Sequence, residues 1–183
     1  MNLEILGRRA LLLVSNPELL HACRTVLEAE GVSIVVPEAA STADIVVAAA
    51  ACADVPILDA VEEELFADWG VFVDTVDIYQ QALPNMLDNR WGRYIWLGPA
   101  RAKSLDTEGG EMDAAVTLGM LGLHKVISGE NAAAGITANA ILYSRAVPPE
   151  ATASAVAFLC SVGAGYLTGV TVTVDGGTGS AMF

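Results

Sequence analysis

GITANAIL at residues 135–142 and SAVAFLCSVGAGYLTGVTVTVDGG at residues 154–177 form the stretch that decides the fold. Ile136–Leu142 and Val170–Val174 are rich in valine, isoleucine and threonine, which is the composition of β-strands. Ala151–Ser161, between them, is an apolar segment of helical length. A strand, a helix and a second strand in this order predict a right-handed crossover unit on a parallel sheet.

The N-terminal part repeats this strand–helix–strand pattern. Ala10–Ser15 contains a continuous apolar run and is followed by a turn at residues 16–17, which predicts a buried strand. Leu19–Glu30 has its apolar residues on one helical face. Val32–Val36 is a second short strand. We therefore expect a βαβ unit at this end of the chain as well.

The middle of the chain completes an α/β pattern. Asp44–Ala51 and Arg93–Leu97 are predicted strands, and Asp59–Asn89 is a long helix with apolar residues at spacings of three and four. Pro99–Gly110 is predicted as a loop, and Ala114–Ile127 as a second long apolar helix. The sequence thus predicts a single domain over residues 1–183, with a doubly wound parallel sheet.

Composition narrows the classes of function. Hydrophobic residues make up 54% of the 183 residues and charged residues 17%, which predicts an ordered core. The net charge of −13 argues against nucleic acid and anionic membranes as partners. No apolar run approaches the roughly 18 residues that span a bilayer. The first residues, MNLEILGRRA, lack the basic region of a signal peptide.

The three cysteines lie in apolar stretches without the spacing of metal ligands. They are Cys23, Cys52 and Cys160. We expect buried free thiols, no bound metal and a reducing, cytoplasmic location.

The motifs of the deciding stretch resemble a known family. The pattern GI-x-x-NAI, then FL-C-S, then YLTG-x-x-x-x-VDGG is similar to the C-terminal third of the short-chain dehydrogenase/reductase family. The pattern is carried by Gly135, Ile136, Asn139, Ala140, Ile141, Val156, Phe158, Leu159, Ser161, Tyr166, Leu167, Thr168, Gly169, Val174, Asp175, Gly176 and Gly177. The resemblance implies a Rossmann-like fold, and in the family this region is mostly scaffold and subunit contact.

The resemblance also implies that the sheet is shortened. The family has a helix and a further strand between the segments that correspond here to Val36 and Asp44, which only a few residues separate. We predict a deletion that leaves one strand fewer at that edge of the sheet. The alternative is that Ser41 and Thr42 cap the remnant of a turn.

The dinucleotide-binding loop of the family has no counterpart here. The family carries Thr-Gly-x-x-x-Gly-x-Gly after the first strand, whereas this chain has Ser15, Asn16, Pro17 and Glu18. A pyrophosphate needs glycines for close backbone approach at the helix N-terminus. Pro17 lacks an N–H group and Glu18 adds a negative charge. We therefore expect no NAD(P) site and no cofactor.

The catalytic residues of the family are also missing at the positions found by counting from matched landmarks. The family uses an asparagine, a serine, a tyrosine and a lysine. Those positions fall here on Val71, Pro99, Asp113 and Thr117. The interval between Ile141 and Ala151 is shorter than the one that closes over substrate in the family.

Four other polar positions remain candidates. Asp113 with Glu111 is expected to be a solvated helix start. His21 and His124 are expected on a surface or in a satisfied core.

Tyr143 and Arg145 follow the predicted strand Ile136–Leu142, at the edge where α/β sheets bind ligands. They are possible contacts for an acidic ligand.

The resemblance and the losses together favour a catalytically inactive subunit of an oxidoreductase complex. It would assemble through its two long helices and last strand with an active short-chain dehydrogenase/reductase or with itself. The alternatives are a cofactor-independent enzyme and a small-ligand-binding protein, each reusing the emptied cleft.

Overall fold

Six parallel strands form the central sheet in the computed structural model, which describes residues 3–49, 59–103 and 111–179. Their order across the sheet is β2-β1-β3-β4-β5-β6, so β1 lies next to the edge strand β2 and the later strands follow one another on its other side. The strands are β1 (Arg9–Leu13), β2 (Ser33–Val35), β3 (Ile45–Ala49), β4 (Gly92–Pro99), β5 (Ile136–Tyr143) and β6 (Thr171–Val174). The predicted Rossmann-like, doubly wound α/β fold is confirmed.

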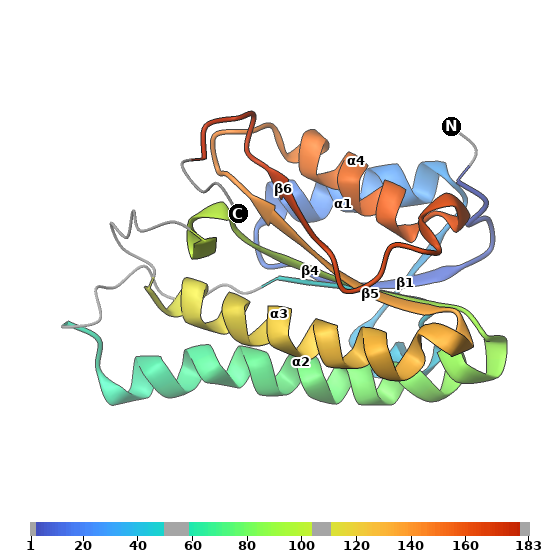
Figure 1. Cartoon of the computed structure of the whole chain (residues 1–183), viewed down its shortest axis with the longest axis horizontal. Helices are drawn as coiled ribbons and strands as arrows, with labels where there is room; N and C mark the ends of the chain where they lie inside the picture. Colours follow the sequence, from blue (N-terminus) through green and yellow to red (C-terminus); the bar gives the residue numbers. More distant parts are fainter. Residues whose placement is uncertain (1–2, 50–58, 104–110, 180–183) are drawn as a thin grey trace.

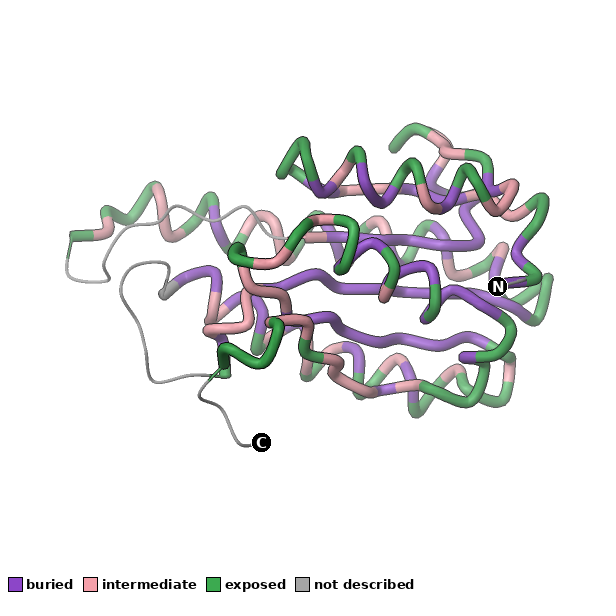
Figure 2. Tube along the Cα trace, turned by 90° about the horizontal axis from the view of Figure 1, so that it is seen from above, coloured by how far each residue is buried: buried purple, intermediate pink, exposed green. Residues whose placement is uncertain are grey.

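Helices cover both faces of this sheet. Figure 1 shows α1 (Pro17–Ala29) and α4 (Pro149–Cys160) above it, and α2 (Glu62–Asn89) and α3 (Glu111–Asn131) below it. Two separate hydrophobic cores result, one on each face. Because both faces are covered, the central strands β3, β4 and β5 are buried up to their last residue, which is half-buried in each, and Figure 2 shows this buried centre.

The shortened edge of the sheet is as predicted. The segment between β2 and β3 is a short 3-10 helix, η1 (Pro37–Thr42), so no strand lies there and β2 is the edge strand. The turn that we considered as an alternative is also present, since Thr42 Oγ1 donates to the Ala39 carbonyl at 2.8 Å. The absence of a strand between β2 and β3 and the turn at Thr42 are therefore both observed.

Asn139 explains why the motif of the deciding stretch is so recognisable. It is fully buried in β5, where its Nδ2 donates to the Leu167 carbonyl at 2.7 Å and its Oδ1 accepts from the Val170 N–H at 3.1 Å. Thr168 Oγ1 adds a bond from the Ala138 N–H at 3.1 Å. The amide side chain thereby helps to fix the backbone that leads into β6, together with backbone bonds from the Gly169 N–H to the Ala138 carbonyl and from the Ala140 N–H to the Val170 carbonyl.

Several predicted boundaries shift. α3 extends over Glu111–Asn131 rather than 114–127, and the predicted loop after β4 contains a 3-10 helix, η2 (Ala100–Lys103). The end of the predicted strand Asp44–Ala51 and Cys52 lie outside the described residues. Cys23 and Cys160 are buried free thiols, as predicted. In the described part of the chain, no helix has the length and hydropathy to cross a membrane.

Candidate functional site

The carboxyl ends of β4 and β5 lie side by side and bring the candidate residues together. Pro99, the last residue of β4, is paired in register with Tyr143, the last residue of β5. The 3-10 helix η2 follows β4 directly and places Arg101 at the same edge. In open α/β sheets, this is the edge where ligands bind. The first turn of α3 approaches it through Asp113.

The expectation that Asp113 is a solvated helix start is wrong. The residue is only 7% exposed, and its Oδ2 lies 3.3 Å from Nη2 of Arg101. A carboxylate this deeply buried requires an opposite charge or hydrogen-bond donors. Arg101 supplies both, so the pair ties η2 to α3. Glu111 begins α3, and its side chain lies outside what the structure describes.

Thr117, at the position counted for the family lysine, is closed in by packing. It is fully buried, and its Oγ1 accepts a hydrogen bond from the Trp96 indole N–H at 3.3 Å. A Cβ on Gly98 would lie 2.6 Å from both Oγ1 and Cγ2 of Thr117. A threonine here therefore requires glycine on the neighbouring strand, and a longer side chain at position 117 would displace the indole contact.

The positions counted for the family asparagine and serine carry no polar side chain. Val71 lies half-buried in α2, and its carbonyl accepts a bond from Thr75 Oγ1 at 2.7 Å. Pro99 has neither a hydroxyl nor an N–H group, and it lines the wall of the pocket described below. Neither side chain can donate to a carbonyl oxygen of a substrate.

The N-terminus of α1 is already capped by the protein. Asn16 is the N-cap residue, and its side chain accepts from the Leu19 N–H at 3.0 Å. Pro17 begins the helix without an N–H group, and Glu18 places a carboxylate in the first turn. Ser15 precedes them and is exposed. Phosphate groups bind helix N-termini through free N–H groups and a positive dipole end, and this arrangement opposes both.

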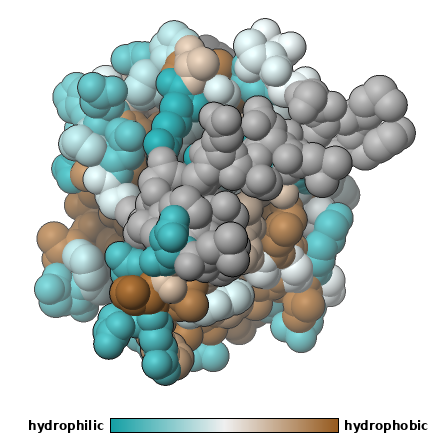
Figure 3. Space-filling view, turned by 90° about the vertical axis from the view of Figure 1, so that its left-hand side faces the viewer, coloured by the Kyte–Doolittle hydropathy of each residue, from teal (hydrophilic) through white to brown (hydrophobic). Residues whose placement is uncertain are grey.

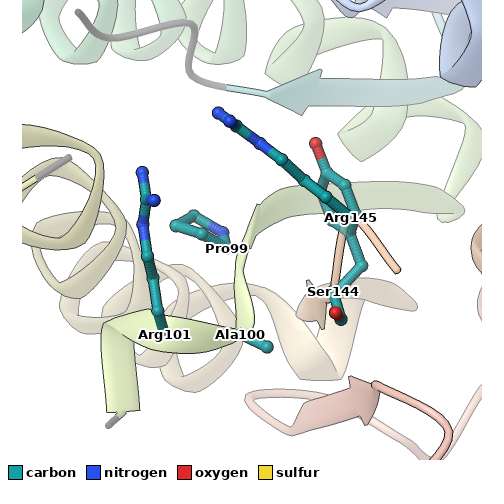
Figure 4. A pocket seen from close by; sticks show the side chains of 6 residues that line it. Pro99, Ala100, Arg101, Ser144 and Arg145 are labelled. Carbon is teal, nitrogen blue, oxygen red and sulfur yellow. The ribbon is translucent and has the colours of Figure 1, made fainter. Parts of the chain in front are cut away.

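A pocket of about 200 Å³ opens at the ends of β4 and β5. Its wall is formed by Pro99, Ala100, Arg101, Tyr143, Ser144 and Arg145. Figure 4 shows the side chains of Arg101 and Arg145 rising to the same side, with Pro99 between them. The two residues singled out from the sequence as possible ligand contacts thus line one pocket, together with a second arginine.

The Tyr143 hydroxyl is a hydrogen-bond donor at neutral pH. Burial raises the pKa of this group above 10.0, and the nearby carboxylate of Asp113 raises it further, whereas Arg145 lowers it. The hydroxyl therefore keeps its proton over the physiological range. A raised pKa makes this tyrosine less suited to general acid–base chemistry, which favours a group whose pKa lies near the operating pH.

The two histidines occupy contrasting places, as expected. His21 is exposed on α1. His124 is 2% exposed on α3, with Nδ1 2.9 Å from the Asn139 carbonyl and Nε2 2.9 Å from the Tyr79 hydroxyl. Because a carbonyl only accepts, Nδ1 carries the proton and Nε2 accepts from the tyrosine. Burial lowers the pKa of His124 to about 4.

Arg101, which lines the pocket, was not predicted from the sequence. It falls in a segment of mixed charge that resembles any surface loop. The only available signal was its place two residues after Pro99, at the carboxyl end of a buried strand. No metal site accompanies it: within residues 3–49, 59–103 and 111–179, histidine, cysteine and acidic side chains form no cluster of three.

Comparison by sequence gives one informative relative. No protein-family model matches the chain. Nodulation protein G from Azospirillum brasilense is 27% identical over 142 residues, which is 61% of this chain and 57% of that protein. The chain thus spans little more than half the length of the curated relative that it matches.

Comparison by structure places the fold among the short-chain dehydrogenases/reductases. The short-chain dehydrogenase/reductase from Serratia marcescens superposes with a TM-score of 0.82 at 22% identity, covering 94% of this chain and 98% of that one. A Bacillus thuringiensis structure assigned as a 3-oxoacyl-reductase gives a TM-score of 0.81 at 18% identity, covering 95% and 99%.

Proposed function

We propose that this chain, which has the short-chain dehydrogenase/reductase fold, is a catalytically inactive subunit that assembles with an active member of that family or with itself. Its role is structural or regulatory within a cytoplasmic oxidoreductase complex. The observation that carries the proposal is that the residues at the two positions counted for the family tyrosine and lysine are held in structural contacts. Asp113 is ion-paired with Arg101, and Thr117 accepts a hydrogen bond from the Trp96 indole N–H.

These contacts support the proposal because both side chains stabilise the folded structure and neither is available to act on a substrate. A buried ion pair is costly to break, by about 3–5 kcal/mol when one partner is removed. The contact between Thr117 and Gly98 likewise belongs to a packed core. Neither arrangement supplies a tyrosine and a lysine to a carbonyl substrate.

The N-terminus of α1 supports the second part of the proposal, the loss of the dinucleotide. The Asn16 side chain already accepts the Leu19 N–H, and Pro17 has no N–H group to donate. The carboxylate of Glu18 would repel a phosphate, so the residues present do not fit a pyrophosphate. We infer that hydride transfer through NAD(P) is not part of this chain's function.

Titration with NADH and NADPH tests this inference. We expect no saturable change in tryptophan fluorescence and no binding heat up to about 1 mM of either nucleotide, a concentration that corresponds to only about −4 kcal/mol. An intact short-chain dehydrogenase/reductase serves as the positive control. Saturable binding below that concentration would contradict the loss of the NAD(P) site, and reduction of a ketone with NADPH would show that the chain is an enzyme.

Exposed apolar side chains on the α2–α3 layer support assembly. Phe66, Trp69 and Val73 follow one another along α2, and Leu118 and Val126 along α3, all with at least 42% exposure. Figure 3, which looks onto the end of the molecule, shows hydrophobic surface on the lower side, where these helices lie. Contiguous exposed apolar patches mark interaction surfaces in soluble proteins.

Charge substitution on this layer tests assembly. Val73→Glu is expected to reduce the native mass measured by light scattering to that of a single chain, because a buried carboxylate at an interface costs several kcal/mol. Val36→Glu is the matched control, since both valines are 62% exposed but Val36 follows the edge strand β2. A wild-type chain that is monomeric alone and recovered from its source without a partner would contradict the proposal.

A small-ligand-binding protein is the second candidate. It is favoured by the pocket at the ends of β4 and β5, which retains arginine, tyrosine and serine side chains. It does not require catalysis and is compatible with a subunit role.

A further inference from the structure

Two arginines share the pocket at the sheet edge, although the protein is strongly acidic. The chain has nine lysine and arginine residues against 22 acidic ones. Arg101 comes from η2 and Arg145 follows β5, so two elements distant in sequence place cationic groups at one pocket. Guanidinium groups recognise carboxylates and phosphates through paired N–H donors.

The rest of the wall restricts the class of anion. Pro99 and Ala100 present apolar surface, and the ring of Tyr143 lies in the same wall with its hydroxyl as a donor. The volume of about 200 Å³ is below the roughly 300–1,000 Å³ of pockets for larger ligands. The pocket therefore suits a short hydrocarbon chain that ends in an acid group.

The carboxylate of Asp113 limits the negative charge that a ligand in this pocket can carry. Its carboxylate lies 3.3 Å from Arg101, which lines the pocket, and it raises the pKa of Tyr143, which also lines the pocket. A dianionic phosphate would be repelled by this carboxylate more strongly than a monoanion would. The charges thus favour a single carboxylate.

We propose that this pocket binds a small aliphatic monocarboxylate, held by the guanidinium of Arg145 and the hydroxyl of Tyr143, with its hydrocarbon chain against Pro99 and Ala100. Binding requires neither NAD(P) nor assembly, so this proposal goes beyond the subunit role. The ion pair with Asp113 holds the Arg101 side chain in place at the pocket wall.

Calorimetric titration of the full chain with sodium butyrate tests the proposal, at an ionic strength held constant with sodium chloride. We expect saturable binding with a Kd of about 1 mM. Arg145→Gln should weaken binding at least tenfold because it removes the charge-assisted bonds, and Tyr143→Phe about fivefold. Arg101→Gln is avoided because it would leave the buried Asp113 carboxylate without this partner.

Arg24→Gln is the matched control. Arg24 lies on α1, where it forms an exposed pair with Glu28, and its loss should leave butyrate binding unchanged. Since Arg145 is also exposed, thermal unfolding should confirm that both variants fold. The proposal is overturned if butyrate does not saturate by about 50 mM, or if Arg145→Gln binds like the wild type. Tighter binding of inorganic phosphate than of butyrate would overturn the monocarboxylate class.

Discussion

Replacing Asn139 by leucine is expected to lower the free energy of unfolding by about 3 kcal/mol, although the two side chains have nearly the same shape. The amide spans the gap between the Leu167 carbonyl and the Val170 N–H. Leucine would leave both backbone groups without these partners beside a fully buried position, at a cost of about 1–3 kcal/mol for each group. Urea unfolding of the wild type and the variant measures the difference.

Asn131→Leu is the appropriate comparison. Its Nδ2 donates to the Ile127 carbonyl at 3.0 Å, at the half-buried end of α3. Only one bond is lost and water can replace it, so the expected loss is within about 1 kcal/mol. Equal losses in the two variants would mean that Asn139 is an ordinary polar residue and does not fix the entry into β6.

The strands of the sheet were predictable because parallel strands are buried on both faces. Ile136–Leu142 is observed as Ile136–Tyr143, and Arg93–Leu97 as Gly92–Pro99. In the sequence, such strands are nearly continuous apolar runs that end at turn residues or at the start of a helix. The resemblance implied the Rossmann-like arrangement of the sheet, and it also located the edge that lacks a strand.

The charged residues of the core were not predictable in the same way. Arg93 interrupts the apolar run of β4, yet it is 2% exposed and donates to the carbonyls of Gly135 at 3.2 Å and Ser161 at 3.3 Å. Burial lowers its pKa to about 10. Its partners come from segments far along the chain, so no local pattern predicts them.

Asp113 shows the same limit at the candidate site. Acidic residues at the start of a helix are usually solvated, and the neighbouring sequence carries nothing to suggest otherwise. The burial of Asp113 depends on how α3 lies against β5 and η2, and its charge partner Arg101 precedes it by a stretch that includes residues 104–110. Tyr143 and Arg145 were predictable because their place depends only on where one strand ends.

Lowering the pH from about 6.5 to about 4 is expected to destabilise the protein by about 3 kcal/mol through His124 alone. Burial lowers the pKa of His124 from 6.5 to about 4 in the folded state. Well above pH 6.5 the imidazole is neutral in both states, and it contributes no pH dependence. Below pH 6.5 the unfolded chain binds a proton that the folded chain does not, so stability falls until the folded pKa is reached.

The slope of stability against pH distinguishes this effect from simple loss of contacts. His124→Gln removes the bonds to Tyr79 and Asn139, so we expect it to be less stable than the wild type at pH 7. Between pH 6.5 and 4, however, its free energy of unfolding should change less steeply with pH than that of the wild type, by up to about 1.4 kcal/mol per pH unit. His21→Gln, on an exposed position of α1, should keep the wild-type slope. Urea unfolding at a fixed protein concentration measures all three chains, so that any assembly contributes equally. A wild-type slope in His124→Gln would mean that burial does not lower the pKa of His124, and it would contradict the prediction.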